Sequence, residues 1–279
     1  MLSKPHHWIR VCSLAAWVTL CTMPTSPAQV TGPVATEQGG QARSPERPKE
    51  VAQEVANESN APSAVPPAEH SYLGREIAQT MSYHGAPWLV RANREDEERP
   101  SEVLKQLDLK PGMVVCDLGC GNGFYTLLMA PQVAPAGKVL AVDIQQEMLH
   151  LLELRSRSEG IDNVEPVLGT IVDPHLPDGQ VDLVLMVDVY HEFSHPQQML
   201  AALRKSLSPT GLIVLLEYRE EDPRVPIKPL HKMSKRQILK EYRANGFKLA
   251  KQYDRLPWQH MMFFAADPEW SAAADDRQR

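Results

Sequence analysis

The sequence predicts an α/β fold with a doubly wound, mostly parallel seven-stranded sheet and an antiparallel hairpin at its C-terminal end. Three observations support this. Apolar runs of strand length alternate with segments of helical periodicity after about residue 100, a glycine-rich turn joins the first run to a helix, and the last two runs have no helix between them. Continuous apolar strands separated by helices are typical of a parallel sheet covered on both faces, a Rossmann-like arrangement.

Each element has a local signal. The first helix starts at Pro100, because proline suits a first turn, and it presents Val103, Leu104 and Leu107 to the core. Gly160 and Gly246 end two later helices. The expected strands are the run ending at Asp117 and residues 138–143, 164–168, 181–189, 212–217, 247–253 and 260–265. The expected helices begin at residues 100 and 124 and cover 145–158, 196–206 and 234–245.

The regions outside this core, which spans residues 100–266, have different compositions. Residues 1–28 have a basic start, a short apolar stretch and a small-residue cleavage site, which indicates a signal peptide and export to the periplasm or the exterior. An uncleaved membrane anchor is the alternative; after cleavage no stable membrane span is expected. Residues 29–70 lack aromatic residues and predict a disordered linker.

Residues 71–99 and 267–279 flank the core. We expect 71–99 to form a helical lid, with a short helix around Tyr72 to Met81 that is broken at 85–88, and we expect 267–279 to be a polar tail. The net charge of −6 and the absence of a long basic block argue against a nucleic-acid partner. Cys116 and Cys120 have no second cysteine pair beside them, so neither a disulfide framework nor a structural zinc site is expected, and no metal is predicted.

The glycine-rich turn is the most informative stretch. Gly119, Gly121 and Gly123 alternate with other residues directly after the apolar run that ends in Asp117. A dinucleotide-binding turn would place its last glycine where Phe124 stands, and no Gly-Lys-Ser/Thr is present to make a P-loop. An acidic residue before the turn favours a ligand with positive charge over a pyrophosphate.

This stretch resembles the first motif of class I S-adenosylmethionine-dependent methyltransferases, an acidic residue followed by Gly-x-Gly-x-Gly. The resemblance covers about residues 100–265 and implies S-adenosylmethionine as the cofactor. It implies that Asp143, with Ile144 beside it, binds the ribose hydroxyls and that Asp173 binds the adenine amino group. Asp143 and Asp173 could instead be a helix cap and a turn residue. The implied cofactor-binding residues are Asp117, Gly119, Gly121, Gly123, Asp143, Ile144, Asp173 and Asp188.

The acceptor side is expected where the fourth strand ends. Tyr190, His191 and Glu192 are the candidate catalytic residues, with His191 favoured as a base because imidazole titrates near neutral pH. A small molecule is the expected acceptor. A methyltransferase-like module that binds the cofactor without catalysis is an alternative, since an exported protein would lie away from the cytosolic cofactor.

A second motif competes with this interpretation. His191-Glu192-x-x-His195 matches a zinc-hydrolase pattern, which requires both histidines on one helix. Pro196 pushes His195 out of helical geometry, so the sequence argues against that helix.

Overall fold

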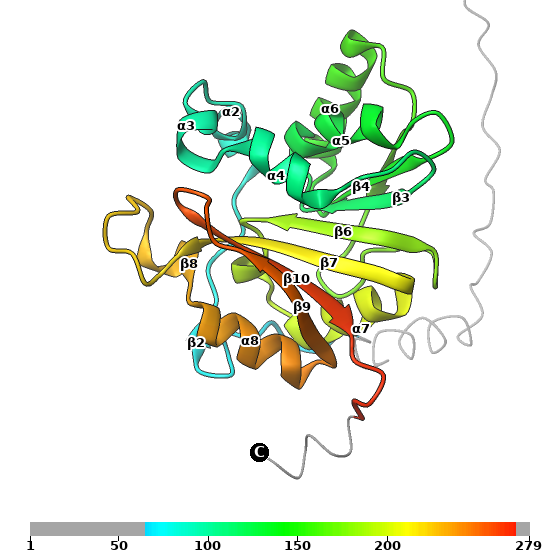
Figure 1. Cartoon of the computed structure of the whole chain (residues 1–279). Coiled ribbons are helices and arrows are strands. Elements are labelled where there is room, and N and C mark those ends of the chain that lie inside the picture. Colours follow the sequence, from blue (N-terminus) through cyan, green and yellow to red (C-terminus); the bar gives the residue numbers. More distant parts are fainter. Residues whose placement is uncertain (1–64, 272–279) are drawn as a thin grey trace, which may run out of the picture. The chain divides into compact units, whose positions relative to one another are not determined.

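The computed structural model describes residues 65–271. The predicted signal peptide, the predicted linker up to residue 64 and the tail from residue 272 lie outside the described residues. Among residues 65–271, no helix has the length and apolar character needed to cross a membrane. Figure 1 shows that the described chain is built around one twisted sheet.

The central sheet confirms the predicted fold class. Its strands are β3 (Val114–Leu118), β4 (Lys138–Asp143), β5 (Val164–Leu168), β6 (Val181–Val187), β7 (Leu207–Arg219), β8 (Lys232–Met233), β9 (Phe247–Tyr253) and β10 (Gln259–Ala266). They are ordered β5-β4-β3-β6-β7-β10-β9, and the short β8, which was not predicted, pairs with β7 outside this order. The pairs from β5 to β7 are parallel, whereas β10 is antiparallel to both of its neighbours.

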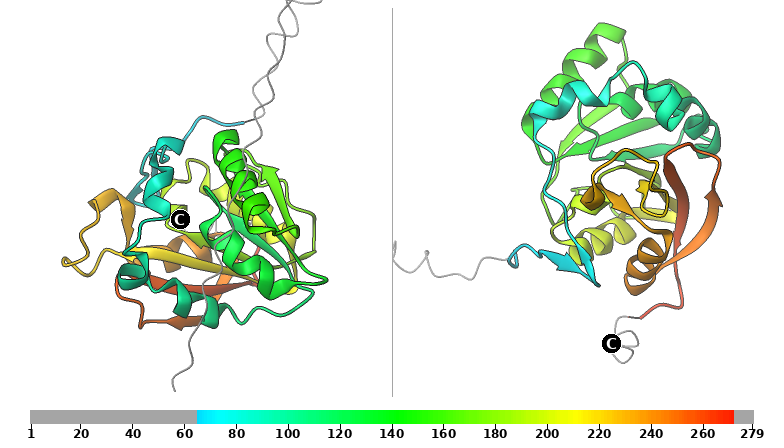
Figure 2. Two further views of the ribbon diagram at one scale, coloured as in Figure 1. Left: turned by 90° about the horizontal axis from the view of Figure 1, so that it is seen from above. Right: turned by 90° about the vertical axis from the view of Figure 1, so that its left-hand side faces the viewer.

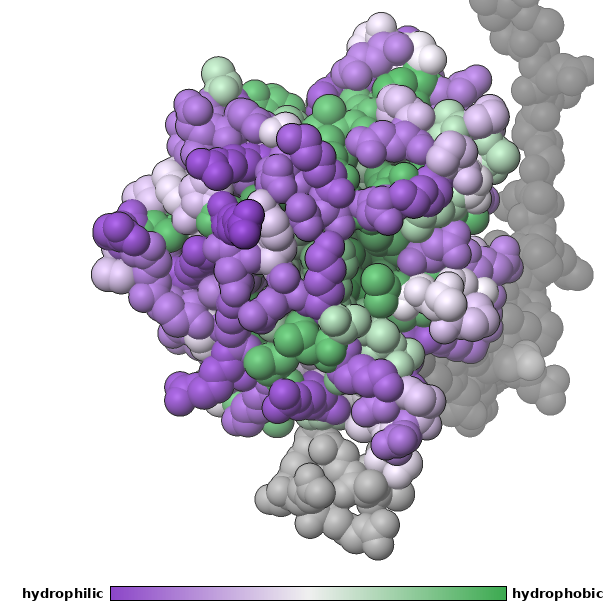
Figure 3. Space-filling view, viewed as in Figure 1, coloured by the Kyte–Doolittle hydropathy of each residue, from purple (hydrophilic) through white to green (hydrophobic). Residues whose placement is uncertain are grey.

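Helices cover both faces of the sheet, as Figures 1 and 2 show. They are α4 (Pro100–Leu107), α5 (Phe124–Val133) and α6 (Gln146–Glu159) on one face, and α7 (Pro196–Ser206) and α8 (Lys235–Ala244) on the other. Successive side chains of a strand point to opposite faces of the sheet and pack against different helices. In β3, Val115 packs with α4 and α5, whereas Cys116 packs with α7 and α8. On the face drawn in Figure 3, hydrophilic residues dominate and apolar residues form smaller areas between them.

Two local expectations about helices are wrong. Residues 72–81 do not form a helix: β1 (Ser71–Tyr72) and β2 (Arg75–Glu76) form a small hairpin. Its two turn residues, Leu73 and Gly74, both have positive φ, as tight hairpin turns require. The stretch expected to break a helix instead contains η2 (Tyr83–Gly85) and α2 (Ala86–Leu89), followed by α3 (Arg94–Glu98).

The ends of several elements differ from the prediction, most of all in β7, which begins at Leu207 and not at residue 212. Strand β6 ends at Val187, two residues before its predicted end. Ser234 stands at the N-cap of α8, but its side chain makes no capping hydrogen bond.

The β1–β2 hairpin is held by a buried ion pair. Arg75 Nε and Nη2 donate to the two carboxylate oxygens of Glu241 at 2.8 and 2.9 Å, and the side chain of Glu241 is fully buried. Tyr190 donates its hydroxyl to the same carboxylate at 2.8 Å, and Arg75 Nη1 donates to the His191 carbonyl at 2.9 Å. The pair therefore joins the N-terminal hairpin, α8 and the turn after β6.

Replacing Arg75 by Leu should lower the free energy of unfolding by about 3–5 kcal/mol, because the Glu241 carboxylate would remain buried without its cation. The matched control is Arg157→Leu, which breaks an ion pair with Glu153 whose arginine side chain is 76% exposed. That control should change stability by less than about 1 kcal/mol. Urea denaturation measures both, and equal effects would contradict the importance of the buried pair.

Candidate active site

A cavity of about 540 Å³ lies at the carboxyl ends of β3, β4 and β6. Ligands of open α/β sheets bind at this edge, because the loops that leave the strands diverge there. Its volume lies in the range of small-molecule sites. The walls are mainly apolar, with contributions from Met81, Trp88, Leu89, Ile144, Met148, Ile171, Val187, Val189, Phe193, Met199 and Ile227.

The glycine turn forms one wall. Gly119 and Gly121 line the cavity with φ of +71° and +55°, a backbone conformation that glycine adopts without strain. A Cβ on Gly119 would lie 2.4 Å from the side chain of Val189, and a Cβ on Gly121 would lie 2.4 Å from that of Leu89. Gly123 is not on the cavity wall; its missing Cβ makes room for Leu152 of α6, so this glycine serves helix packing.

Asp143 ends β4 and connects two turns. Its Oδ2 accepts the Gly121 N–H and its Oδ1 accepts the Gln145 N–H, both at 2.9 Å. Burial raises the pKa of Asp143, although these backbone donors favour the carboxylate. Each carboxylate oxygen has capacity for another donor, and both Asp143 and Ile144 line the cavity. Asp143 is thus placed to accept hydrogen bonds from a ligand's hydroxyl groups.

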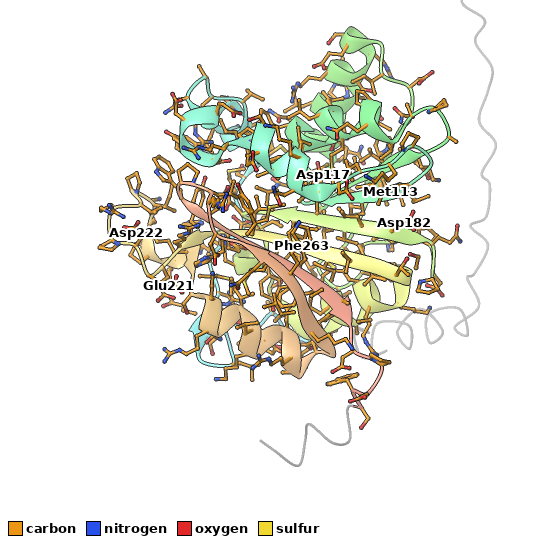
Figure 4. The ribbon with its side chains drawn as sticks, in the orientation of Figure 1. Met113, Asp117, Asp182, Glu221, Asp222 and Phe263 are labelled. Carbon is orange, nitrogen blue, oxygen red and sulfur yellow. The ribbon has the colours of Figure 1, made fainter. Side chains whose placement is uncertain are left out.

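Asp117 does not line the cavity, contrary to the expected role in cofactor binding. Its carboxylate lies between β3 and α5 (Figure 4), where Oδ2 accepts the Thr126 hydroxyl at 2.6 Å. The Thr126 backbone N–H also bonds to this carboxylate. The N-cap of α5 is Gly123, which has no side chain that could cap the helix. The Asp117 carboxylate therefore accepts one of the backbone N–H groups at the start of α5.

Asp173 also departs from its expected place. It is exposed in the loop after β5, lies outside the cavity lining and accepts the His175 N–H at 2.8 Å. This is the turn role that the sequence left open as the alternative. Thr170 and Ile171, just before it, reach the cavity instead.

Asp188 follows β6 and lines the cavity in an unusual conformation, with φ of +53°. A non-glycine residue in this region stores backbone strain, which clusters at functional sites. Oδ2 accepts the Gln259 side-chain amide at 2.7 Å, whereas the buried Oδ1 has no hydrogen-bond partner. Burial, together with Glu98 and Glu217 nearby, raises the pKa of Asp188 well above its ordinary value. Asp188 therefore places a carboxyl group on the cavity wall, with its Oδ1 atom shielded from solvent.

The three predicted catalytic residues form η3 (Tyr190–Glu192), but not all of them face the cavity. His191 and Glu192 line the cavity. Tyr190 does not, because its ring is fully buried against α8 and its hydroxyl bonds to Glu241. The expectation that Tyr190 faces an acceptor is therefore wrong. Burial raises the pKa of Glu192 to about 7, and both of its oxygens accept the Met81 N–H at 3.2 Å.

His191 belongs to a chain of polar side chains. Its Nδ1 lies 2.7 Å from Glu217 Oε2, and its Nε2 lies 3.0 Å from His231 Nδ1 of η4 (Pro229–His231). Burial is the largest single influence and favours the neutral imidazole, but Glu217, Glu192 and Asp188 together outweigh it and raise the pKa of His191. Burial and the neighbouring His191 lower the pKa of His231. Sequence reasoning missed His231, because it lies forty residues from His191 in a loop with no motif of its own.

The structure does not form the zinc-hydrolase motif. His195 lies at the N-cap of α7 with its Nε2 2.8 Å from the Pro66 carbonyl and its Nδ1 2.9 Å from the Ser194 hydroxyl. His195 is also absent from the cavity wall. As the proline predicted, no helix places His191 and His195 one turn apart.

The segment between Met81 and Glu98 covers the cavity and contributes residues that the sequence did not reveal. Asn122 of the glycine turn donates to the Ala86 carbonyl at 3.0 Å, and Gln145 accepts the Tyr83 N–H at 2.8 Å. Glu98 is fully buried at the other end and bonds to Arg91, Arg94 and Tyr218. The lid expected at residues 71–99 thus has fixed attachments, although its internal structure differs from the prediction.

Comparisons with known proteins agree with this geometry. Residues 109–260 match the family described as methyltransferase domain. A demethylmenaquinone methyltransferase of Symbiobacterium thermophilum is 30% identical over 161 residues, which are 56% of this chain and 64% of that protein. An uncharacterised 37.1 kDa protein in transposon TN4556 of Streptomyces fradiae is 38% identical over 117 residues, 42% of this chain and 33% of that protein. The chain therefore spans less than two thirds of the length of these curated relatives.

A solved structure matches over a larger share of its length. The crystal structure of a SAM-dependent methyltransferase from Aquifex aeolicus has a TM-score of 0.63 and 25% identity, covering 66% of this chain and 98% of that chain.

Asp117 should make stability depend on pH. Burial raises its pKa from 3.8 to about 6, so between about pH 4 and 6 the folded state holds a proton that the unfolded state has released. The free energy of unfolding should therefore fall as pH rises through this window, by up to about 3 kcal/mol for this group. Asp117→Asn should lose that part of the pH dependence in urea denaturation at pH 4 and 7.

The control is Asp222→Asn. Asp222 lies in the loop after β7, far from Asp117 in Figure 4, and its side-chain bond to Arg224 lowers its pKa to about 2. Its titration therefore falls below the window, and this variant should keep the wild-type slope. An unchanged slope in Asp117→Asn would show that Asp117 is not the responsible group.

Proposed function

The chain belongs to the methyltransferase domain family, and from this premise we propose that it transfers the methyl group of S-adenosylmethionine to a small organic acceptor. The observation that carries the proposal is the Asp143 carboxylate, which is bonded to the Gly121 N–H and lines the cavity at the carboxyl edge of the sheet. S-adenosylmethionine supplies a methyl group activated on a positively charged sulfur. The residues around the cavity then need mainly to bind, orient and exclude water.

Different parts of the cavity suit different parts of the cofactor. We assign the ribose hydroxyls to Asp143, because its oxygens retain acceptor capacity. Ile144, Met148 and Ile171 are apolar residues of the same wall and suit the flat base. The Asp188 carboxyl group, which also lines the cavity, suits the ammonium group at the other end of the cofactor. Gly119 and Gly121 permit close approach of the ligand to the turn.

We place the acceptor between the cofactor and the turn that carries His191 and Glu192. Both side chains line the cavity, and Glu217 orients the His191 ring through Nδ1. The apolar walls favour an acceptor with an apolar body, and the polar turn suits an O–H, S–H or acidic C–H group. The name of the Symbiobacterium relative, a demethylmenaquinone methyltransferase, supports a small organic acceptor.

Calorimetric titration of the full chain with S-adenosylmethionine tests the cofactor site. Asp143→Ala should weaken binding about 10- to 100-fold, because charge-assisted hydrogen bonds contribute about 1.5–3 kcal/mol each. Asp173→Ala is the matched control, since Asp173 is exposed outside the cavity, and its affinity should stay within about twofold of wild type. No binding by the wild-type chain would refute the proposal.

Turnover with a panel of phenol, quinol, thiol and amine acceptors separates the enzyme from a module that only binds cofactor. Formation of S-adenosylhomocysteine that depends on the acceptor supports catalysis. Tight cofactor binding without product across the panel would favour the inactive module.

A further inference from the structure

We propose that His191, Glu192 and His231 form a binding site for one divalent first-row transition-metal ion, with Zn²⁺ as the reference ion, on the acceptor side of the cavity. One ligand atom from each residue lies within 4.8 Å of the others, and all three residues line the cavity. The role of the ion in catalysis rests on the proposed function, whereas its binding does not.

The spacing of the ligand atoms suits a single ion. His191 Nε2 lies 3.0 Å from His231 Nδ1 and 3.8 Å from Glu192 Oε1. In a tetrahedral zinc site with bonds near 2.0–2.1 Å, neighbouring ligand atoms are about 3.3 Å apart. The two imidazole rings are inclined at 84°, so their nitrogens can converge on one point without the rings colliding. The two distances from His191 Nε2 therefore lie within about 0.5 Å of that value, and the remaining pair, His231 and Glu192, lies within 4.8 Å.

The surroundings of His191 have the form expected of a metal ligand. Glu217 accepts from Nδ1 at 2.7 Å, which holds the proton on Nδ1 and leaves the lone pair of Nε2 for an ion. Metal-binding histidines usually donate their second nitrogen to such a carboxylate. The Glu217 side chain is fully buried, so the ring orientation is fixed before any ion binds. His231 is held by η4 and presents its Nδ1 to the same point.

Charge also favours a cation here. Glu192 and the buried Glu217 both approach His191, and Asp188 is a third carboxyl group near it. The opposing positive charges are Lys228, close to His231, and Arg75, which is paired with Glu241 but also bonds to the His191 carbonyl. The Arg91 and Arg94 side chains of the cavity wall are paired with Glu98, so they do not neutralise this group. A bound divalent ion would compensate acidic groups that burial otherwise penalises.

The ligand set indicates which ion would bind. Two imidazoles and one carboxylate suit zinc, iron, cobalt or nickel, whereas magnesium and calcium prefer oxygen ligands. Three protein ligands leave at least one coordination position open, as in catalytic zinc sites, and here it would face the cavity. An acceptor hydroxyl or thiol that bound to the ion at this open position would be stabilised in its deprotonated form. The site differs from the His-Glu-x-x-His motif, because His231 replaces His195 as the third ligand.

Metal binding to the full chain, first stripped with a chelator, tests the proposal. Titration with Zn²⁺ should give one site per chain, and Co²⁺ should give the visible absorption bands of a site with nitrogen ligands. His231→Ala should weaken Zn²⁺ binding at least about tenfold, and Glu217→Gln should weaken it about 10- to 100-fold. His195→Ala, the matched control, should bind Zn²⁺ like the wild type, because His195 lies outside the cavity lining.

Binding of S-adenosylmethionine, measured on the same samples, shows that each variant is folded and separates the two proposals. Wild-type chain that binds S-adenosylmethionine but no Zn²⁺ or Co²⁺ overturns the metal site and leaves His191 as a base without an ion. Zn²⁺ binding without S-adenosylmethionine binding refutes the proposed function alone. Binding that is lost in His195→Ala and kept in His231→Ala would overturn the assignment of the ligands.

Discussion

Three buried acidic side chains and one that is partly buried lie near the carboxyl edge of the sheet, and the hydrogen-bond donors around each determine what that edge can bind. Asp117 bonds to Thr126, Asp143 to two backbone N–H groups, Asp188 to Gln259 and Glu217 to His191. A buried carboxyl group without donors costs several kcal/mol, so this edge depends on these partners. Asp117 bonds only within the fold, whereas Asp143 and Asp188 line the cavity and Glu217 bonds to His191, which also lines it.

The cover of the cavity is tied to the same edge. Asn122 of the glycine turn and Gln145, which follows Asp143, both bond to the covering segment. Arg75 in the preceding hairpin bonds to Glu241 and also to the carbonyl of His191. The turn that carries His191 and Glu192 is therefore held from the sheet by Glu217 and from the N-terminal segment by Arg75 and Met81. Preorganisation of this kind lowers the cost of orienting a reacting group.

The fold and part of the site could be predicted because their signals are local. Apolar periodicity located the strands, and the glycine turn with Asp143 and Asp188 located the cavity. The short N-terminal helix was predicted wrongly because the hairpin there depends on a turn with positive φ and on contacts with α8. Asp117 was misassigned because its position in the motif does not reveal that its side chain points toward α5.

By itself, the sequence determined the α/β architecture, the family of the chain and the strand ends at which the cavity lies, since periodicity and turn chemistry act over a few residues. Only the tertiary structure decided which side chains meet there. It brought His231 to His191, turned Tyr190 and His195 away and left Asp173 in solvent. Such contacts join residues far apart in the chain, and their geometry follows from the packing of whole elements, which no local pattern encodes.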